Sequence, residues 1–343
     1  MVLIWYTDII LILGYLVMLS LDIWKIIWNC LDFKSQLNLI SSCSYFRNNL
    51  FITDLYHIKK KYLSALTTNI LKYPIFKNIS KLNASYNIKI KNISFLKSLK
   101  VLNASYSCGI SQNDIKELEL FYLNANYNFK IINVSFMKSL KKLYIENDCG
   151  INQDGIKNLN LFKLSANDNK KITNVSFMKS LKKLSISCRC GISQNGIKGL
   201  DLIELNVNFN ENINNISFMK SLKKLHACGS VCYINQQNIQ ELTLVELYAD
   251  FNGKITNVSF MKSLKKLYAC QNCGINQNGI KNLNLVELFV DYNEKITNVS
   301  FMKSLKILHA VGNSGINKNG VKGLNLVHID ISDNPNFALI NKK

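Results

Sequence analysis

The stretch LVELFVDYNEKITNVSFMKSL, residues 285–305, carries the pattern that decides the fold of this chain. Leucines stand at its first and fourth positions, an apolar residue at the sixth, Asn at the ninth and Ile at the twelfth. Units of this form, L-x-x-L-x-(A/V/I)-x-x-N-x-x-I, follow one another along the chain. The thirteen units start at Ile79, Leu99, Leu120, Leu140, Leu161, Leu181, Leu202, Leu222, Leu244, Leu264, Leu285, Leu305 and Leu326. Such self-similarity predicts an array of stacked units.

Two units together form a longer period. The motif SFLKSLK begins at Ser94, and SFMKSLK begins at Ser135, Ser176, Ser217, Ser259 and Ser300, at intervals of 41, 41, 41, 42 and 41 residues. Stacked arrays are quasi-one-dimensional, and their common use is an extended concave binding surface. The repeats therefore favour a recognition protein over an enzyme.

Alternation along each short strand assigns the side chains to two faces. Successive side chains of a strand point to opposite sides, so the fourth and sixth positions should enter the core and the third, fifth and seventh should face outward. Asn occupies the ninth position of every odd-numbered unit, where the chain turns and backbone groups need partners. We expect a structural ladder from Asn87, Asn128, Asn169, Asn210, Asn252, Asn293 and Asn334.

The spacing of these units resembles the leucine-rich-repeat family over residues 79–343. The resemblance implies an α/β solenoid, a horseshoe of about 13 repeats with a helical N-terminal domain. The return INQNGIKNL, residues 275–283, is similar to that of cysteine-containing repeats in F-box proteins, with Gly279 suited to a tight bend. The family's ninth-position Cys is displaced to the tenth here, at Cys108, Cys149, Cys190 and Cys273.

Residues 19–50 carry apolar residues at helical spacing, and Ser35 can cap a second helix. This segment resembles an F-box through Leu19, Asp22, Ile23, Ile27, Leu31, Asp32, Ser35, Leu37, Cys43, Phe46 and Arg47, with Ser20 in place of the usual Pro. The alternative is a helical cap that only covers the first repeat. The resemblance implies an adaptor-binding surface made of Leu19, Leu21, Ile23, Ile27, Leu31, Leu37, Ile40 and Phe46.

The whole chain is similar to F-box/leucine-rich-repeat proteins, and its Lys/Asn/Ile bias resembles versions carried by giant DNA viruses of amoebae. The resemblance implies an F-box that binds a Skp-type adaptor in a cullin ubiquitin ligase, repeats that bind an unknown target protein, and no catalytic residues or cofactor. We expect a cytoplasmic protein, in the host cytoplasm if it is viral. The alternative is a repeat scaffold for protein interaction with no link to ubiquitin.

The remaining segments are harder to assign. Residues 1–18 are apolar, and a membrane anchor through residues 2–19, an extra cap helix or an upstream start codon all stay open. Residues 51–78 are a linker and repeat cap, in which residues 56–76 predict a helix ending near Pro74. The C-terminus has no obvious cap.

Composition restricts the partners. The net charge is +20, but Arg47 and Arg189 are the only arginines, and no aromatic stacking platform stands out. We attribute the lysines to biased composition and argue against nucleic-acid binding, while an anion-binding lysine surface stays a weaker alternative. Equivalent cysteines two strands apart lie about 10 Å from each other, too far for a disulfide. We expect reduced, metal-free thiols, although Cys228, Cys232, Cys270 and Cys273 have the alternative of a metal cluster.

Outward positions define the candidate partner-binding face. The third positions alternate in charge from Lys183 and Glu204 onward, which predicts either a binding surface or a self-satisfied ladder. The fifth positions become aromatic in the C-terminal half, which marks either recognition or strand preference. His309 neighbours Asp330, but no nucleophile completes a hydrolase site. The predicted face consists of Lys224, His226, Glu246, Tyr248, Asp250, Lys266, Tyr268, Glu287, Phe289, Asp291 and His309. We expect Ala substitutions of its aromatics to leave folding unchanged.

Overall fold

The computed structural model describes residues 21–338, which form two compact units, Met1–Leu120 and Phe121–Lys343. Leu19 and the apolar residues 2–19 lie outside the described residues. Among residues 21–338, no helix has both the length and the apolar character needed to cross a bilayer.

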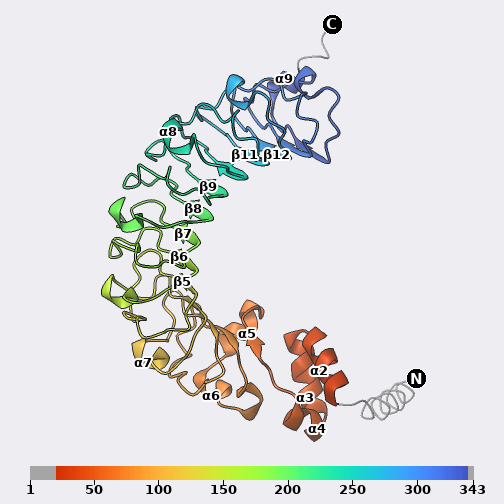
Figure 1. Ribbon diagram of the computed structural model, residues 1–343. Coiled ribbons are helices and arrows are strands. Elements are labelled where there is room, and N and C mark those ends of the chain that lie inside the picture. Colours follow the sequence, from red (N-terminus) through yellow and green to blue (C-terminus); the bar gives the residue numbers. More distant parts are fainter. Residues whose placement is uncertain (1–20, 339–343) are drawn as a thin grey trace, which may run out of the picture. The chain divides into compact units, whose positions relative to one another are not determined.

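The N-terminal unit begins with helices and continues into parallel strands (Figure 1). Its sheet joins β1 to β2 and β2 to β3, with Asp54 opposite Lys81 and Leu82 opposite Leu102. Its elements are α2 (Leu21–Cys30), α3 (Phe33–Ser42), α4 (Ser44–Asn49), β1 (Asp54–Leu55), α5 (Lys60–Ala65), α6 (Thr68–Leu71), η1 (Pro74–Phe76), β2 (Lys81–Asn83), β3 (Val101–Asn103) and α7 (Gln112–Ile115).

Helix α3 starts two residues before the predicted cap. Asp32, and not Ser35, is its N-cap residue, because the Asp32 carboxylate accepts a hydrogen bond of 2.8 Å from the amide of Ser35. This bond holds the pKa of Asp32 below its usual value. The helices close on an aromatic core, in which the rings of Trp24 and Phe46 meet edge to face at 4.5 Å.

The single helix predicted over residues 56–76 is wrong. The chain there forms α5, α6 and the turn η1, separated where Thr67 caps α6 by accepting from the amide of Ile70. The strand β1 precedes them, and Ile52 and Leu55 are buried like the first and fourth positions of a repeat. The linker is therefore an additional, longer repeat-like turn.

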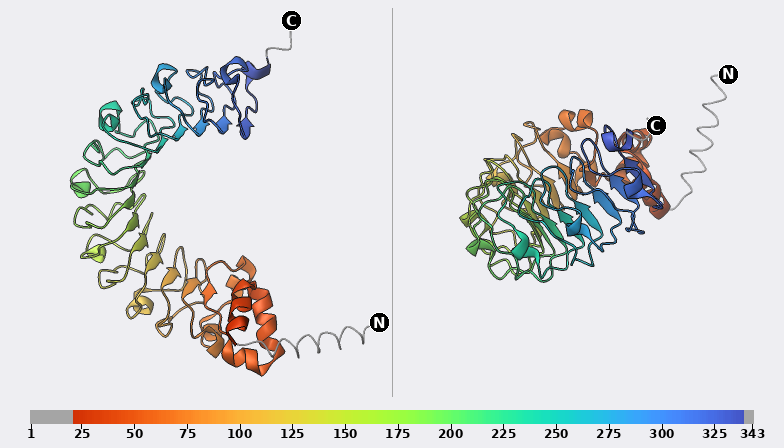
Figure 2. Two further views of the ribbon diagram at one scale, coloured as in Figure 1. Left: turned by 45° about the vertical axis from the view of Figure 1, so that its right-hand side comes forward. Right: turned by 90° about the horizontal axis from the view of Figure 1, so that it is seen from above.

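The C-terminal unit is a stack of eleven three-residue strands, each paired in parallel with the next. Figures 1 and 2 show the strands along the inner side of a curved ribbon, with the return segments on its outer side. The strands are β4 (Tyr122–Asn124), β5 (Lys142–Tyr144), β6 (Lys163–Ser165), β7 (Lys183–Ser185), β8 (Glu204–Asn206), β9 (Lys224–His226), β10 (Glu246–Tyr248), β11 (Lys266–Tyr268), β12 (Glu287–Phe289), β13 (Ile307–His309) and β14 (His328–Asp330).

The returns contain short turns instead of long helices. These are η2 (Asp154–Ile156), η3 (Asn195–Ile197), α8 (Gln236–Ile239), η4 (Asn278–Ile280), η5 (Asn319–Val321) and the terminal α9 (Pro335–Ala338). Gly279 lies in η4, but not for the predicted bend: a Cβ there would lie 2.3 Å from the Thr256 carbonyl oxygen. Close approach of two neighbouring backbones explains this glycine.

Each of the thirteen predicted units contains one strand at its third to fifth positions, β2 to β14, so the predicted solenoid is confirmed. The fourth and sixth positions form the core, as Leu247 and Ala249 illustrate with no exposed surface. The predicted asparagine ladder is also confirmed. Asn252, for example, donates to the carbonyls of Ala227 and Ile234, at 2.8 and 3.0 Å, and accepts from the amide of Lys254.

Candidate functional site

The charged residues at the third position of the repeat units, which are the first residues of strands β7 to β12, lie in register, as predicted. Strand pairing puts Lys and Glu alternately opposite each other from Lys183 to Glu287. Three ion pairs form, Lys183–Glu204 at 2.8 Å, Lys224–Glu246 at 2.9 Å and Lys266–Glu287 at 2.5 Å.

These pairs neutralise most of the charge on the concave strands. Partial burial is the largest influence on Glu246 and acts to raise its pKa, but the hydrogen bonds from Lys224 and Tyr248 and the charges of Lys224 and Lys266 together lower the pKa of Glu246. The hydrogen bond that Lys266 donates to the Glu287 carboxylate raises the pKa of Lys266. Each lysine of the ladder is already paired with a glutamate, so the ladder has little net charge. A partner would therefore gain little electrostatic attraction from it and would be recognised mainly by shape.

The side chains at the fifth position of the repeat units, which are the last residues of strands β9 to β13, form one continuous stack of rings. The centroid separations are 4.0 Å for His226–Tyr248, 4.4 Å for Tyr248–Tyr268, 4.0 Å for Tyr268–Phe289 and 4.6 Å for Phe289–His309, with interplanar angles between 4° and 24°. The parallel register produces this geometry, because it aligns the same position of each strand.

Stacking limits which parts of the rings a binding partner can contact. Every inner ring uses both faces on its neighbours, so a partner can reach only the ring edges and the tyrosine hydroxyls. The rings are half-buried, and Tyr248 also donates to Glu246 at 3.2 Å. The stack is therefore part of the packing as well as a candidate contact surface, and the expectation that Ala substitutions leave folding unchanged stays a prediction.

The two aspartates beside the stack are tied to the backbone. Asp250 accepts a hydrogen bond of 2.8 Å from the amide of Cys270, and Asp291 accepts one of 2.8 Å from the amide of Val311. Asn208 at the equivalent position bonds the amide of Cys228 in the same way. These carboxylates thus link successive strands, and the second oxygen of Asp250 also accepts a hydrogen bond of 3.8 Å from the Cys228 thiol.

Two histidines end the aromatic stack. Burial lowers the pKa of His226, with Lys224 contributing, so its imidazole is neutral near pH 7. His309 lies beside Asp330, with 3.9 Å between Nδ1 and Oδ2, as strand pairing predicted. The side chains beside these histidines on the concave surface are aromatic or already hydrogen-bonded, which is typical of a surface that contacts a partner.

The predicted adaptor-binding residues divide into two groups. Ile23 is 43% exposed on α2, and Leu21, Ile27, Leu31 and Leu37 are half-buried; Leu19 is outside the described residues. Ile40 and Phe46 are 8% and 1% exposed, respectively. Those two belong to the helical core beside Trp24, so their assignment as contact residues is corrected to a structural one.

Six of the ten cysteine thiols are buried, and Cys30 is exposed. All ten lie within the described residues and none is bridged, and no group of three or more His, Cys, Asp or Glu there is arranged to hold a metal. Burial raises the pKa of Cys228 and Cys273 to about 12 each. Because the thiolate is the nucleophile and the metal ligand, these side chains are poorly suited to either role at neutral pH.

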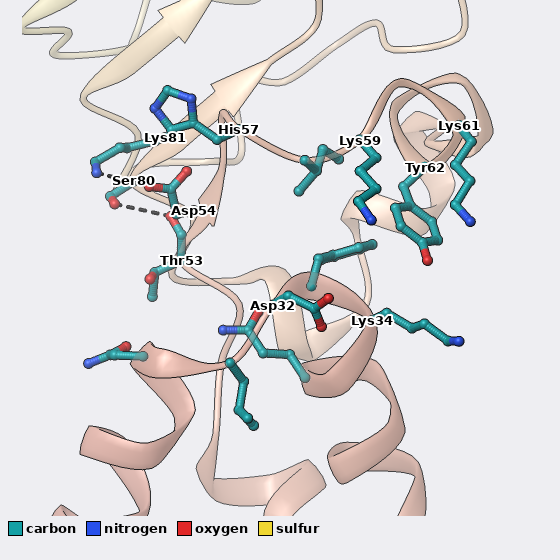
Figure 3. A pocket seen from close by; sticks show the side chains of 15 residues that line it. Asp32, Lys34, Thr53, Asp54, His57, Lys59, Lys61, Tyr62, Ser80 and Lys81 are labelled. Atoms are coloured by element: carbon teal, nitrogen blue, oxygen red, sulfur yellow. Dashed lines mark hydrogen bonds and ion pairs between the residues drawn. The ribbon is translucent and has the colours of Figure 1, made fainter.

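A cavity of about 620 Å³ in the N-terminal unit is another concave feature (Figure 3). Charged residues of α3, β1 and the start of α5 line it. Its acids are engaged: Lys81 holds Asp54 at 2.9 Å, and Asp32 caps α3. Ser80 donates to the Thr53 carbonyl at 3.1 Å. Both carboxylates are engaged, whereas the His57 side chain also lines the cavity.

Comparison with known proteins identifies the architecture. TLR13, solved in a complex with ssRNA13, matches with a TM-score of 0.51 and 20% identity over 83% of this chain. The fold is that of a leucine-rich-repeat solenoid. This chain spans 47% of the TLR13 chain. Two internalins of Listeria are also similar, InlF of Listeria monocytogenes at 16% identity (77% and 93% of the two chains, TM-score 0.47) and InlJ at 17% (78% and 67%, 0.42). No family model and no curated protein matches.

The structure exposes further residues that the predicted sites did not include. Ile26 on α2 is 66% exposed. Aromatic residues also occupy the eighth position of many repeat units, in the turn that follows the strand, where φ is positive. Phe209 and Tyr292, for example, have φ angles of 55° and 56° and are 47% and 49% exposed. Bulky residues rarely adopt this conformation. Their spacing, three residues after the fifth position, was the available signal.

Proposed function

We propose that this protein is a non-catalytic adaptor of a Skp–cullin–F-box type ubiquitin ligase. In this proposal the helical segment α2–α4 binds the Skp-type adaptor, and the concave strands of the C-terminal unit bind a target protein. The observation that carries the proposal is an exposed apolar stripe on α2, within the segment that resembles an F-box. We place its action in the cytoplasm.

Helix α2 is apolar on two faces. Trp24 and Trp28 form its buried face, each 3% exposed, and the Trp28 indole donates to the Phe51 carbonyl at 2.9 Å. Ile23 and Ile26, 43% and 66% exposed, occupy a second face with exposed Cys30. Residues spaced by three and seven share one side of a helix. An exposed apolar stripe of this kind is typical of a surface that docks a partner.

The concave strands suit the second half of the proposal. A parallel sheet with aligned positions offers a partner a row of equivalent contacts, which is how solenoids bind extended surfaces. The aromatic stack from His226 to His309 is the distinctive part of that row. Aromatic residues are enriched among the side chains that dominate binding energy. Since the ladder beside the stack is neutralised, we propose that shape and apolar contact decide target choice.

A second function is favoured by one departure from the F-box pattern. Ser20 stands where the adaptor-contacting corner normally has Pro. If that corner does not dock, the protein acts as a repeat scaffold that brings proteins together without ubiquitin transfer. Both functions use the same concave strands, so only the N-terminal helices distinguish them.

Co-purification tests the proposal. Full-length chain is co-expressed with a Skp-type adaptor and its cullin. We expect the wild type to retain both and Ile26→Lys to lose them, because a charge would be buried against the adaptor. Asn38→Lys adds the same charge at an exposed position of α3, a different helix from the one that carries the stripe, and should retain both. Absence of adaptor from the wild-type complex would reject the ligase function and leave the scaffold.

A further inference from the structure

The outer side of the C-terminal unit carries an aromatic row that the proposed function does not use. The sequence SFMKSL occurs five times in this unit, and each copy buries its Met and exposes the Phe and the Lys on either side of it. The phenylalanines are between 38% and 40% exposed in all five copies. They are Phe136, Phe177, Phe218, Phe260 and Phe301.

A row of lysines runs through the same return segments. Each SFMKSL copy contributes one exposed Lys, and four of the intervening turns contribute another directly after η2, η3, η4 or η5. These are Lys138, Lys157, Lys179, Lys198, Lys220, Lys262, Lys281, Lys303 and Lys322. Within the described residues, only Lys220 of these nine forms an ion pair, with Glu241. Unlike the concave ladder, this row keeps its positive charge.

Packing alone does not account for the identical copies. The fifth positions of the same five units have diverged to Asn124, Ser165, Asn206, Tyr248 and Phe289. The buried Met is identical because the core requires it, as the 0% exposure of Met219 illustrates. Phe and Lys on either side of it face solvent and are nevertheless unchanged in every copy. An exposed aromatic and an exposed cation repeated together point to a repeating ligand.

We infer that this Phe–Lys surface binds single-stranded nucleic acid. Such binding combines a cationic track for the phosphates with aromatic side chains on which bases stack. The lysines recur at about every turn of the solenoid and supply the cationic track. The phenylalanines recur at every second turn and supply the stacking side chains. The row follows the outer side of a curved unit, where Figure 1 places α8. A flexible strand can follow that curve, whereas a flat bilayer meets only part of it.

This inference revises the sequence interpretation that argued against nucleic acid. That interpretation rested on the lack of aromatic platforms and on the scarcity of Arg. Only the structure separates the buried Met from the exposed Phe, and it aligns residues that lie 41 apart. Lysine, as a point charge, can contact phosphates without reading sequence. We therefore expect binding without sequence preference, at a surface distinct from the concave strands.

Fluorescence anisotropy of the full-length chain tests the inference. The probes are fluorescein-labelled oligouridylate and oligothymidylate of about 20 nucleotides, longer than a usual binding site. We expect the triple variant Phe177→Ala, Phe218→Ala, Phe260→Ala to bind roughly 100-fold more weakly, at about fivefold per stacked base. The corresponding Leu triple variant keeps apolar packing without a ring and should show the same loss. Similar affinity for both probes means recognition of backbone and bases, and a preference for uridylate assigns the ligand to RNA.

Two variants that lose the same number of charges distinguish a defined binding site from non-specific electrostatic attraction. The variant Lys179→Gln, Lys198→Gln, Lys262→Gln, Lys281→Gln should reduce the slope of log affinity against log salt by about 2.8, at roughly 0.7 per lost phosphate contact. The control removes the same charge from the strands, at Lys142, Lys163, Lys183 and Lys224, and should change the slope much less.

Three outcomes would overturn the inference. The first is an equal loss in the row variant and its control, which means non-specific attraction to a basic protein. The second is unchanged affinity of both the Ala and the Leu triple variants with circular dichroism like the wild type. The third is binding of anionic phosphatidylserine vesicles by a protein that binds neither oligonucleotide.

Discussion

Asparagine is the residue on which the turns of this solenoid depend. Asn252 has no exposed surface, and its amide replaces three backbone partners that the bent chain cannot supply for itself. The same arrangement recurs at Asn293, which donates to Ala269 and Ile275 and accepts from Lys295. Buried backbone groups without partners are costly, so the side chain is required wherever the turn recurs.

Asn252→Ala should therefore destabilise the C-terminal unit strongly. It leaves two carbonyls and one amide without partners, at roughly 1–3 kcal/mol for each buried group, and we expect a total loss of about 3–9 kcal/mol. Asn257→Ala is the matched control, because Asn257 is exposed and its side chain accepts a local hydrogen bond from the Ser259 amide, while its bonds to Gln236 use the backbone. Urea unfolding followed by circular dichroism compares them; equal midpoints for the two variants would contradict the structural role.

At the scale of the strand, the aromatic stack shows what a sequence can and cannot predict. Alternation placed Tyr248, Tyr268 and Phe289 on the outward face, and strand pairing confirms it. Ring orientation depends on side-chain rotation, which alternation does not specify, so the stacking at 4.0–4.6 Å could not be foreseen. Likewise, helical spacing identified α2 but not which of its two apolar faces packs inward.

The stack makes a prediction about stability. Tyr268→Ala removes two stacked contacts, and at roughly 0.5–1.5 kcal/mol for each pair we expect a loss of about 1–3 kcal/mol. Tyr268→Phe keeps both ring faces and should unfold within about 0.5 kcal/mol of the wild type. Thermal unfolding measures both. If the Ala variant is as stable as the wild type, the rings act only as a contact surface.

At the scale of the molecule, two kinds of contact alternate between turns. From an odd to an even unit, a seventh-position side chain bonds the next strand, as Asn208 does with Cys228. From an even to an odd unit, a Gln bridges to the next return, as Gln194 does by accepting from the amides of Asn214 and Asn215. The thirteen-unit pattern was readable from the sequence because its leucines are periodic, whereas this alternation depends on side-chain partners.

Deletions should distinguish one unit from two. Removing residues 161–201 joins Asn160 to Leu202, which restores a contact of the even-to-odd kind, and we expect cooperative unfolding near the wild-type temperature. Removing residues 161–180 joins two even units and puts Arg189 where Asn169 stood. That variant loses at least one buried Asn network, about 3–9 kcal/mol. Differential scanning calorimetry compares the two, and equal melting of both would show that the alternation is unimportant.

The alternation also governs how a gene for such a chain can change in length. Recombination between misaligned copies of the SFMKSL segment inserts or removes whole 41-residue blocks, and every new junction matches one that already folds. The inner surface gains or loses two strands at a time, without any new contact having to evolve. Exchange offset by a single unit is selected against, because its product has mismatched neighbours. A solenoid built in pairs can therefore vary its reach freely while its construction stays the same.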